Sequence, residues 1–278
     1  MTVRLRAEKV TVGYGGRPVV RDLDLDVVDG TVTAVIGPNG CGKSTLLKAL
    51  ARLLPLASGR VLLDGEPLSD LPGRRIATTL GVLPQSPQAP EGLTVADLVT
   101  RGRHPHQTWY RQWSSDDEGV VADALARTGI ADLAERPIEQ LSGGQRQRAW
   151  ISMVLAQGTD LLLLDEPTTY LDLAHQVDVL ELVATLHREA GRTVVMVLHD
   201  LNLAARYADR LVAMDGGRIA AAGTPAEVLT ETTLAEVFGL DAAVVPDPHA
   251  GTPLVVPRGR TPPAGRQAHA PSAAPPST

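Results

Sequence analysis

Cysteines and long apolar runs are scarce in this chain of 278 residues. Cys41 is the only cysteine, so no intrachain disulfide can form and nothing points to an oxidising compartment. No uncharged apolar run approaches the about 18 residues that a membrane-spanning helix needs. Residues 1–6 lack the apolar core of a secretion signal. If the protein acts at a membrane, we expect it to dock onto other subunits there.

Aromatic residues and excess positive charge are scarce as well. Aromatic side chains make up 3% of the chain, and the net charge is −6. This charge argues against a nucleic-acid surface, and we expect no nucleic-acid partner. Hydrophobic residues at 44% and charged residues at 21% are ordinary for a globular protein. The length allows one large α/β domain or two small ones.

The pattern of apolar residues predicts an α/β fold with a β-rich start. Apolar and charged residues alternate over residues 3–7 and 22–27, which is typical of half-buried strands. The apolar runs at 31–36, 161–164 and 193–198 each end in polar residues or glycine. They suggest parallel strands buried on both faces, with function at their C-terminal ends. Helices are expected at residues 43–54 and 174–190.

The middle and the end of the chain differ from this α/β pattern. Residues 88–157 hold helical patterns at 95–101, 117–128 and 142–157, so we expect an inserted helical subdomain. Residues 214–219 contain two glycines and predict a hairpin. From Pro246 the composition becomes rich in proline and alanine, which indicates a mostly disordered tail. This tail is either a non-functional extension or a segment that binds lipid or a partner.

These patterns define the expected domains. We expect one large domain at residues 1–239, containing the helical insertion at about 88–157. A C-terminal extension follows at 240–278 and is expected to be disordered from about residue 258.

The segment after the third predicted strand fits the phosphate-binding pattern G-x-x-x-x-G-K-[ST]. Backbone N–H groups of a glycine loop and a helix N-terminus can bind phosphate oxygens. Lys43 would neutralise the β- and γ-phosphates of ATP, and Ser44 would ligate Mg²⁺ through its hydroxyl. The predicted nucleotide-binding residues here are Gly37, Pro38, Asn39, Gly40, Cys41, Gly42, Lys43, Ser44 and Thr45.

Asp165 and Glu166 follow four leucines and resemble the second acidic motif of such nucleotide sites. Asp165, at the strand end, can hold Mg²⁺, and Glu166 is a candidate general base for the attacking water. The alternative is a strand that ends in solvated acids.

A glycine turn about 100 residues after the phosphate loop is a second possible anion-binding site. Ser142 is a suitable N-cap for the helix that follows, which would be a purely structural role. Exposed backbone beside it and the amide of Gln145 could bind a γ-phosphate. The motif consists of Leu141, Ser142, Gly143, Gly144 and Gln145.

Four further residues are candidates for the site. His199 ends a predicted strand and could reach the γ-phosphate, although a lone histidine is usually structural. Gln85 also follows a strand, and its amide could bridge Mg²⁺ and the attacking water. Tyr14 lies between two glycines and could stack on adenine. Cys41 lies near a helix N-terminus, a setting that can favour the thiolate, and we expect its alkylation to block ATP binding.

Taken in order, these motifs resemble the ATP-binding cassette (ABC) ATPases over about residues 3–239. The resemblance includes the segment from Thr169 through Tyr170 and Leu171 to Asp172. It implies a P-loop NTPase (RecA-like) core with an antiparallel β subdomain and an inserted α-helical subdomain. It also implies that two copies pair head-to-tail, so that the motif of residues 141–145 acts on the other copy's ATP. Asp172 would lie on a loop at this dimer interface, and Gln85 would link the site to a transmembrane partner.

Within this family, Thr94-Val95 and the segment of residues 101–106 resemble the ATPase subunits of iron–siderophore importers. Those relatives often have an aromatic residue at the position of His104. The implied function is an ATPase that uses ATP and Mg²⁺ to energise uptake of ferric siderophores. The implied partners are a second ATPase subunit, two permease subunits and a solute-binding protein, at the cytoplasmic side of the cell membrane. An importer for vitamin B12, haem or a metal ion is the main alternative, and a soluble ABC protein of repair or translation is a weaker one.

Overall fold

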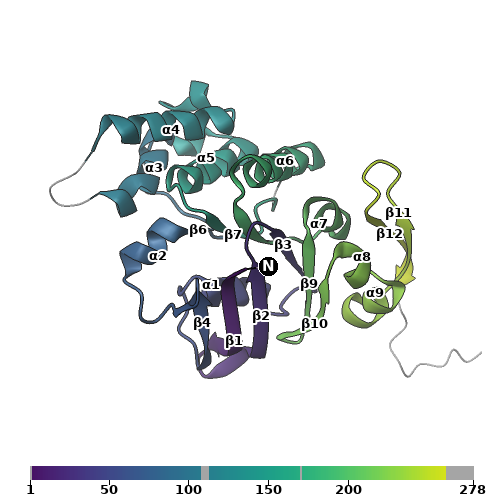
Figure 1. Ribbon diagram of the computed structural model, residues 1–278. Helices are drawn as coiled ribbons and strands as arrows, with labels where there is room; N and C mark the ends of the chain where they lie inside the picture. Colours follow the sequence, from purple (N-terminus) through teal and green to yellow (C-terminus); the bar gives the residue numbers. More distant parts are fainter. Residues whose placement is uncertain (1, 108–112, 170, 261–278) are drawn as a thin grey trace, which may run out of the picture.

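The computed structural model describes residues 2–107, 113–169 and 171–260, which form three sheets with helices packed around them (Figure 1). The central sheet has six strands in the order β10-β9-β3-β8-β7-β6. Strands β3, β6, β7, β8 and β9 run parallel, and β10 pairs antiparallel with β9 in the hairpin predicted at residues 214–219. The strands are β3 (Val32–Ile36), β6 (Leu80–Leu83), β7 (Leu161–Asp165), β8 (Thr193–Val197), β9 (Arg210–Asp215) and β10 (Arg218–Gly223).

Both faces of this sheet are covered, as the unbroken apolar runs predict. Every residue of β3, β7 and β8 is buried. Successive residues face opposite sides, so Ala34 belongs to one hydrophobic cluster and Val35 to the other. The carboxyl ends of β3, β6, β7 and β8 therefore lie along one edge of the sheet, where their polar residues can meet.

An antiparallel sheet in the order β2-β1-β4-β5 covers one side of the core. Leu23, Leu25 and Val27 of β2 are buried while the aspartates between them are exposed, which confirms the alternation. Helix α1 packs under this sheet and ends at residue 50 and not at 54, because Arg52 takes a left-handed backbone conformation. The elements are β1 (Val3–Tyr14), β2 (Arg17–Val28), β4 (Ser58–Leu63), β5 (Glu66–Pro67) and α1 (Lys43–Leu50), followed by α2 (Gly73–Thr79).

A layer of helices lies on the other side of the central sheet (Figure 1). Three of them begin with a capping box in which a serine or threonine hydroxyl accepts the N–H of the third helical residue, at Thr94, Ser114 and Ser142. None of the helices in the described ranges has the length and apolar character needed to cross a membrane. The elements are α3 (Val95–Thr100), η1 (Arg101–His106), α4 (Ser115–Arg127), η2 (Ala131–Leu133), η3 (Ile138–Gln140) and α5 (Gly143–Ala156).

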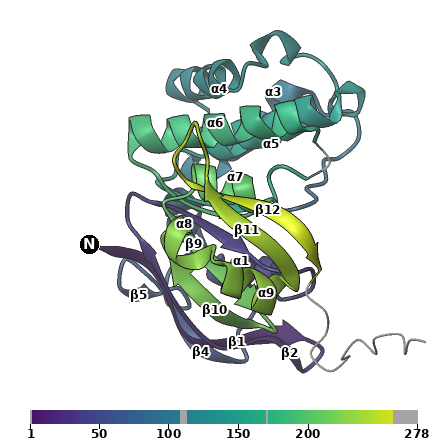
Figure 2. The same cartoon turned by 90° about the vertical axis from the view of Figure 1, so that its right-hand side faces the viewer.

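The C-terminal part corrects one expectation. A two-stranded antiparallel sheet of β11 and β12 lies beside helix α7 (Figure 2). The tail expected to be disordered from Pro246 is therefore ordered as strand at Pro253–Arg260, and the expectation for residues 261–278 lies outside the described residues. The remaining elements are α6 (Leu173–Ala190), α7 (Leu201–Tyr207), α8 (Pro225–Val228), α9 (Glu231–Phe238), β11 (Leu240–Pro246) and β12 (Pro253–Arg260).

Candidate functional site

The glycine loop between β3 and α1 has a backbone that only glycine adopts easily. Gly37 has a φ of 150° and Gly42 a φ of 106°. A Cβ atom on Gly37 would lie 2.3 Å from the carbonyl oxygen of Met214, so no side chain fits there. The loop wraps over the N-terminus of α1, where no side chain caps the first-turn N–H groups. These groups are free to bind an anion.

Lys43 and Ser44 point to different parts of this loop. The ammonium of Lys43 is buried and donates hydrogen bonds to the carbonyl oxygens of Gly37 (2.8 Å) and Pro38 (3.0 Å). The hydroxyl of Ser44 donates to Oδ1 of Asp165 at 2.8 Å. The structure thus joins the glycine loop to the end of β7, 121 residues further along the chain.

Glu166 is surrounded by three hydrogen-bonding side chains. Its Oε1 lies 2.7 Å from Nε2 of His199. Its Oε2 accepts hydrogen bonds from Nε2 of Gln85 at 2.6 Å and from Oγ1 of Thr169 at 2.8 Å. Glu166 has a φ of 53°, which is unusual for a residue other than glycine. Gln85, Glu166 and His199 come from three separate segments, and the structure brings all three together.

The two neighbouring carboxylates have opposite pKa shifts. Burial raises the pKa of Asp165, and the charge of Glu166 adds to this effect. Burial also acts to raise the pKa of Glu166, but hydrogen bonds from His199, Thr169 and Gln85 outweigh it and lower the pKa. Glu166 is therefore held as a carboxylate at neutral pH, in the state that can accept a proton from water.

A pocket of about 650 Å³ lies over these groups. Its lining includes Tyr14, the glycine loop, Gln85, Glu166 and His199. This volume suits a nucleotide-sized ligand. Tyr14 is half exposed at the rim, as expected for a ring that stacks on a base. The pocket can thus hold phosphates at one end and a base at the other.

The oxygen donors of the pocket fit a magnesium ion. The hydroxyl of Ser44 and the carboxylate of Asp165 are in direct contact, and the amide of Gln85 lies beside Glu166. Hydroxyl, carboxylate and amide oxygens are the ligands that Mg²⁺ prefers. Asp165 is a buried carboxylate with a raised pKa, and a bound cation would relieve the cost of its charge.

The motif of residues 141–145 lies elsewhere. Among the residues that the structure describes, none from 141 to 145 lines this pocket. Ser142 caps α5, and its hydroxyl accepts the N–H of Gln145 at 3.3 Å. Asp172 is the N-cap of α6 and is exposed, while Tyr170 lies outside the described residues. One chain therefore provides a glycine-loop pocket and, apart from it, the turn of residues 141–145, here called the signature turn, of which Ser142 and Gly143 are exposed.

The expectation of a thiolate at Cys41 is wrong. Cys41 is buried, and this burial raises the pKa of its thiol despite the nearby charge of Lys43. The thiol is therefore protonated at neutral pH and closed to reagents in this conformation. A small apolar side chain that packs under the loop is its observed role.

Thr169 lines the pocket, although its place in the sequence did not predict this position. It lies three residues after Glu166, and its N–H donates to the carbonyl oxygen of Glu166 at 3.2 Å. This turn directs its hydroxyl back to the carboxylate. The spacing of an acid and a threonine at i and i+3 after a strand is the only local signal for it.

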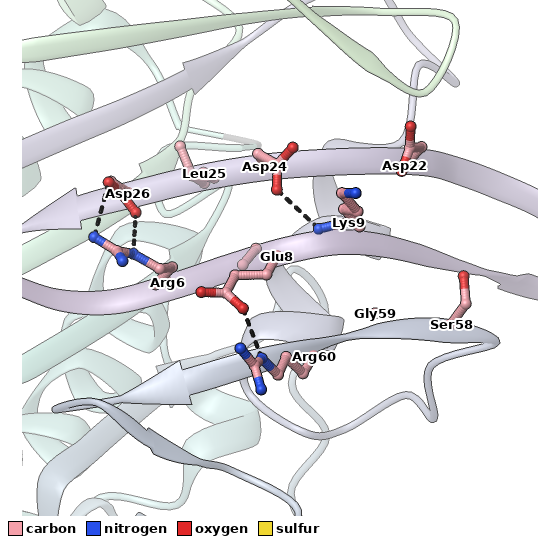
Figure 3. Close-up of a pocket in the computed structure, with 11 residues that line it drawn as sticks. Arg6, Glu8, Lys9, Asp22, Asp24, Leu25, Asp26, Ser58, Gly59 and Arg60 are labelled. Carbon is pink, nitrogen blue, oxygen red and sulfur yellow. Dashed lines mark hydrogen bonds and ion pairs between the residues drawn. The ribbon is translucent and has the colours of Figure 1, made fainter.

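A larger hollow of about 970 Å³ lies on the outer face of the antiparallel sheet, away from the glycine loop (Figure 3). Its charged side chains largely satisfy one another. Arg6 pairs with Asp26 at 2.7 Å and Arg60 with Glu8 at 2.6 Å. The chemistry is assigned to the smaller pocket because the phosphate motif and the carboxylate cluster lie there.

Comparison with known proteins identifies relatives along almost the whole chain. The profile of the family described as "ABC transporter" matches residues 20–169. The petrobactin import ATP-binding protein FpuD of Bacillus anthracis is 51% identical, over 94% of this chain and 95% of that protein. The ferric enterobactin transport ATP-binding protein FepC of Escherichia coli is also 51% identical, over 94% and 96%. The hemin import ATP-binding protein HmuV of Streptomyces coelicolor is 49% identical, over 88% and 87%.

Solved structures give the same result. An inward-facing metal-chelate type ABC transporter has a TM-score of 0.79 at 30% identity, over 92% of this chain and 98% of that chain. The dimeric cassette MJ0796 in a post-hydrolysis state with ADP and Pi has a TM-score of 0.70 at 27% identity, over 79% and 98%. A nucleotide-sized pocket between a glycine loop and an ionised glutamate thus occurs on the fold of these proteins. The chain belongs to the ABC transporter family, as one of its ATP-binding and ATP-hydrolysing subunits.

Proposed function

We propose that the chain is the ATPase subunit of an importer for ferric siderophores. The observation that carries this proposal is the 51% identity, along nearly the full length, to two ATP-binding proteins of siderophore import. The cargo itself does not touch this subunit in such a system, so the proposal rests on similarity and not on a cargo pocket.

We assign roles to the pocket residues on the basis of their positions. Residues 37–45 bind the phosphates of ATP, and Lys43 moves from the loop carbonyls to the β- and γ-phosphates. Ser44, Asp165 and Gln85 would hold Mg²⁺, which would supply charge neutralisation at the phosphates. Tyr14 stacks on adenine.

The carboxylate cluster prepares the attacking water. Glu166 accepts a proton from it, and the lowered pKa of Glu166 keeps that acceptor ionised. Gln85 and His199 lie against the two oxygens of Glu166, so they are placed to orient the water and the γ-phosphate. General base assistance of this kind contributes about 10²–10⁴-fold to a rate.

The second half of the site comes from another copy. We place residues 141–145 of one chain over the ATP held by its partner, with Asp172 on the interface between the two copies. The support is that Ser142 and Gly143 of this turn are exposed, that none of the described residues 141–145 lines the pocket of its own chain, and that the cassette MJ0796 is dimeric. Such a head-to-tail homodimer closes on ATP and opens after hydrolysis.

The other partners belong to the membrane. We place the dimer on two permease subunits, at the cytoplasmic side of the cell membrane, with a solute-binding protein delivering the cargo to the permease. Residues 1–239 form the ATPase domain, the helical layer of residues 88–157 contacts the permease, and residues 240–278 are the C-terminal extension.

The catalytic part of this proposal is tested by Glu166→Gln. We expect the variant to bind ATP, to accumulate as a dimer on gel filtration with ATP, and to lose turnover by about 10²–10⁴-fold. Glu8→Gln, on the surface of the antiparallel sheet, is the matched control and should keep wild-type turnover. Near-normal hydrolysis by Glu166→Gln would remove Glu166 from the role of base.

The cargo is tested by uptake. Deleting the gene should abolish uptake of ⁵⁵Fe supplied as one ferric siderophore, and the wild-type gene but not Glu166→Gln should restore it. Hemin import is the second candidate because HmuV is 49% identical. Loss of hemin uptake with normal uptake of ferric siderophores would favour that candidate and reject the first.

A further inference from the structure

His175 occupies the space beside a glycine of the signature turn. Gly144 is the second residue of α5 and is buried. A Cβ atom on Gly144 would lie 2.8 Å from Cδ2 and 3.3 Å from Cγ of His175, so a side chain there would have to displace the imidazole ring. The imidazole ring therefore fills the place that a side chain at residue 144 would take. Glycine at residue 144 lets the ring lie directly against the start of α5.

The same ring binds Asp172. Nδ1 of His175 lies 2.7 Å from Oδ1 of Asp172, and the backbone N–H of His175 donates to that oxygen at 3.0 Å. An ionised carboxylate only accepts hydrogen bonds, so Nδ1 is the nitrogen that carries the hydrogen. These two bonds lower the pKa of Asp172, with the backbone bond as the larger cause. Asp172 thus remains an ionised acceptor for the ring.

The ring joins the start of α5 to the start of α6. Gly144 is the second residue of α5, Asp172 is the N-cap of α6, and His175 lies in the first turn of α6, which follows β7 of the central sheet. One helical turn further on, Arg148 of α5 pairs with Asp178 of α6 at 2.5 Å. Two contacts thus connect α5 and α6 along one side, and His175 makes the one that lies at the signature turn.

We propose that His175 is a positioning residue that couples the Asp172 loop to the signature turn of its own chain. Both elements are offered to the second copy, so the coupling presents them as one rigid half-site. This inference rests on the proposed function, in which the signature turn completes the partner's pocket. Because the Asp172 loop and the signature turn are held together, less conformational freedom is lost when the dimer closes. Small misplacements of groups in such a site lower the rate of hydrolysis strongly.

Three variants separate the two contacts of the ring. His175→Phe keeps a ring against Gly144 but has no donor for Asp172. His175→Asn places an amide N–H near the position of Nδ1 and removes the far edge of the ring. His175→Ala removes both contacts. His187→Ala is the matched control, because His187 lies near the other end of α6, with Nδ1 3.0 Å from the carbonyl oxygen of Arg192.

The measurements are steady-state turnover of the full chain, binding of TNP-ATP to the monomer, and ATP-driven dimer formation in the Glu166→Gln background. We expect His175→Ala to lower kcat about tenfold and to raise the ATP concentration for half-dimerisation about tenfold. His175→Phe and His175→Asn should each keep part of the function, and TNP-ATP binding should stay within about twofold of wild type. His187→Ala should match wild type in all three measurements.

Two results would overturn the inference. The first is wild-type turnover and dimerisation in His175→Ala. The second is an equal loss of TNP-ATP binding and turnover, which would indicate a general structural defect. If the proposed function is wrong, the Glu166→Gln variant with His175 unchanged will not dimerise with ATP. If that variant does dimerise, and adding His175→Ala to it does not change the ATP concentration for half-dimerisation, only the coupling role of His175 is wrong.

Discussion

The carboxylate of Asp165 is buried at the end of β7, beside the charge of Glu166. Burial disfavours the ionised form, so the pKa of Asp165 is raised above its ordinary value of 3.8. The folded state therefore binds the proton more tightly than the unfolded chain does. Protonation of Asp165 stabilises the fold below pH 3.8, and this stabilisation is lost as the pH rises through the raised pKa. At neutral pH the charge opposes folding.

Asp165→Asn should therefore raise the melting temperature of the nucleotide-free chain at pH 7. The amide oxygen can still accept the hydrogen bond from Ser44, while the buried charge is gone. The gain should shrink as the pH is lowered toward 4, and stabilisation by Mg-ATP should be lost. Scanning calorimetry between pH 4 and 8 tests this, with the exposed Asp22→Asn as control. A lower melting temperature for Asp165→Asn at pH 7 would contradict the assignment.

At the level of elements, Asn202 of α7 forms two hydrogen bonds with the hairpin β11–β12. Nδ2 of Asn202 donates to the carbonyl oxygen of Val255 at 3.2 Å, and Oδ1 of Asn202 accepts the N–H of Val255 at 2.7 Å. The amide thus pairs with the edge of β12 as a neighbouring strand would. Helix α7 begins directly after His199 and Asp200, so the hairpin supports the helix that follows the pocket.

Asn202→Ala should loosen this hairpin. Two hydrogen bonds at about 0.5–1.5 kcal/mol each predict a loss of about 1–3 kcal/mol in the local opening free energy. Hydrogen exchange at the Val255 amide should accelerate, while exchange in β3 and β8 should not change. Asn202→Asp keeps the acceptor and loses the donor, so its effect should be smaller. Unchanged exchange at Val255 in Asn202→Ala would show that other contacts hold the hairpin.

The whole molecule carries two unlike half-sites. One is the glycine-loop pocket with Glu166, and the other is the turn headed by Ser142. In a head-to-tail dimer each complete site combines the pocket of one chain with the turn of the other. A symmetric pair thus contains two equivalent sites.

Ser142→Arg should bind ATP as a monomer and hydrolyse almost none. Its defect lies in the half-site offered to the partner, whereas the defect of Glu166→Gln lies in the pocket. Mixing these two inactive variants should restore about a quarter of wild-type turnover, because half of the dimers are mixed and each contains one intact site. Turnover is measured against the mixing ratio. No recovery would place Ser142 and Glu166 in one site and contradict the two-chain arrangement.

The sequence by itself determined the features that depend on neighbours along the chain. The glycine loop is contiguous, so its motif, strand and helix could be identified from residues 31–50. The periodicity of buried strands and capped helices is local too, and it predicted β3, β7, β8, α3, α4 and α5. Strand β12 was missed because Pro253 and Pro257 argue against a strand. A two-stranded sheet consists only of edges, where proline is tolerated.

Only the tertiary structure decided the contacts between distant segments. Parallel strands end at one edge of the sheet, and this brings together Gln85, Glu166, Thr169 and His199. The distances between these side chains cannot be obtained from their spacing along the sequence. The high pKa of the Cys41 thiol arises from burial, which the loop sequence does not contain. The contact of His175 with Gly144 depends on how α5 packs against α6. Sequence determines local conformation through the backbone, whereas burial and long-range hydrogen bonds exist only once the chain has packed.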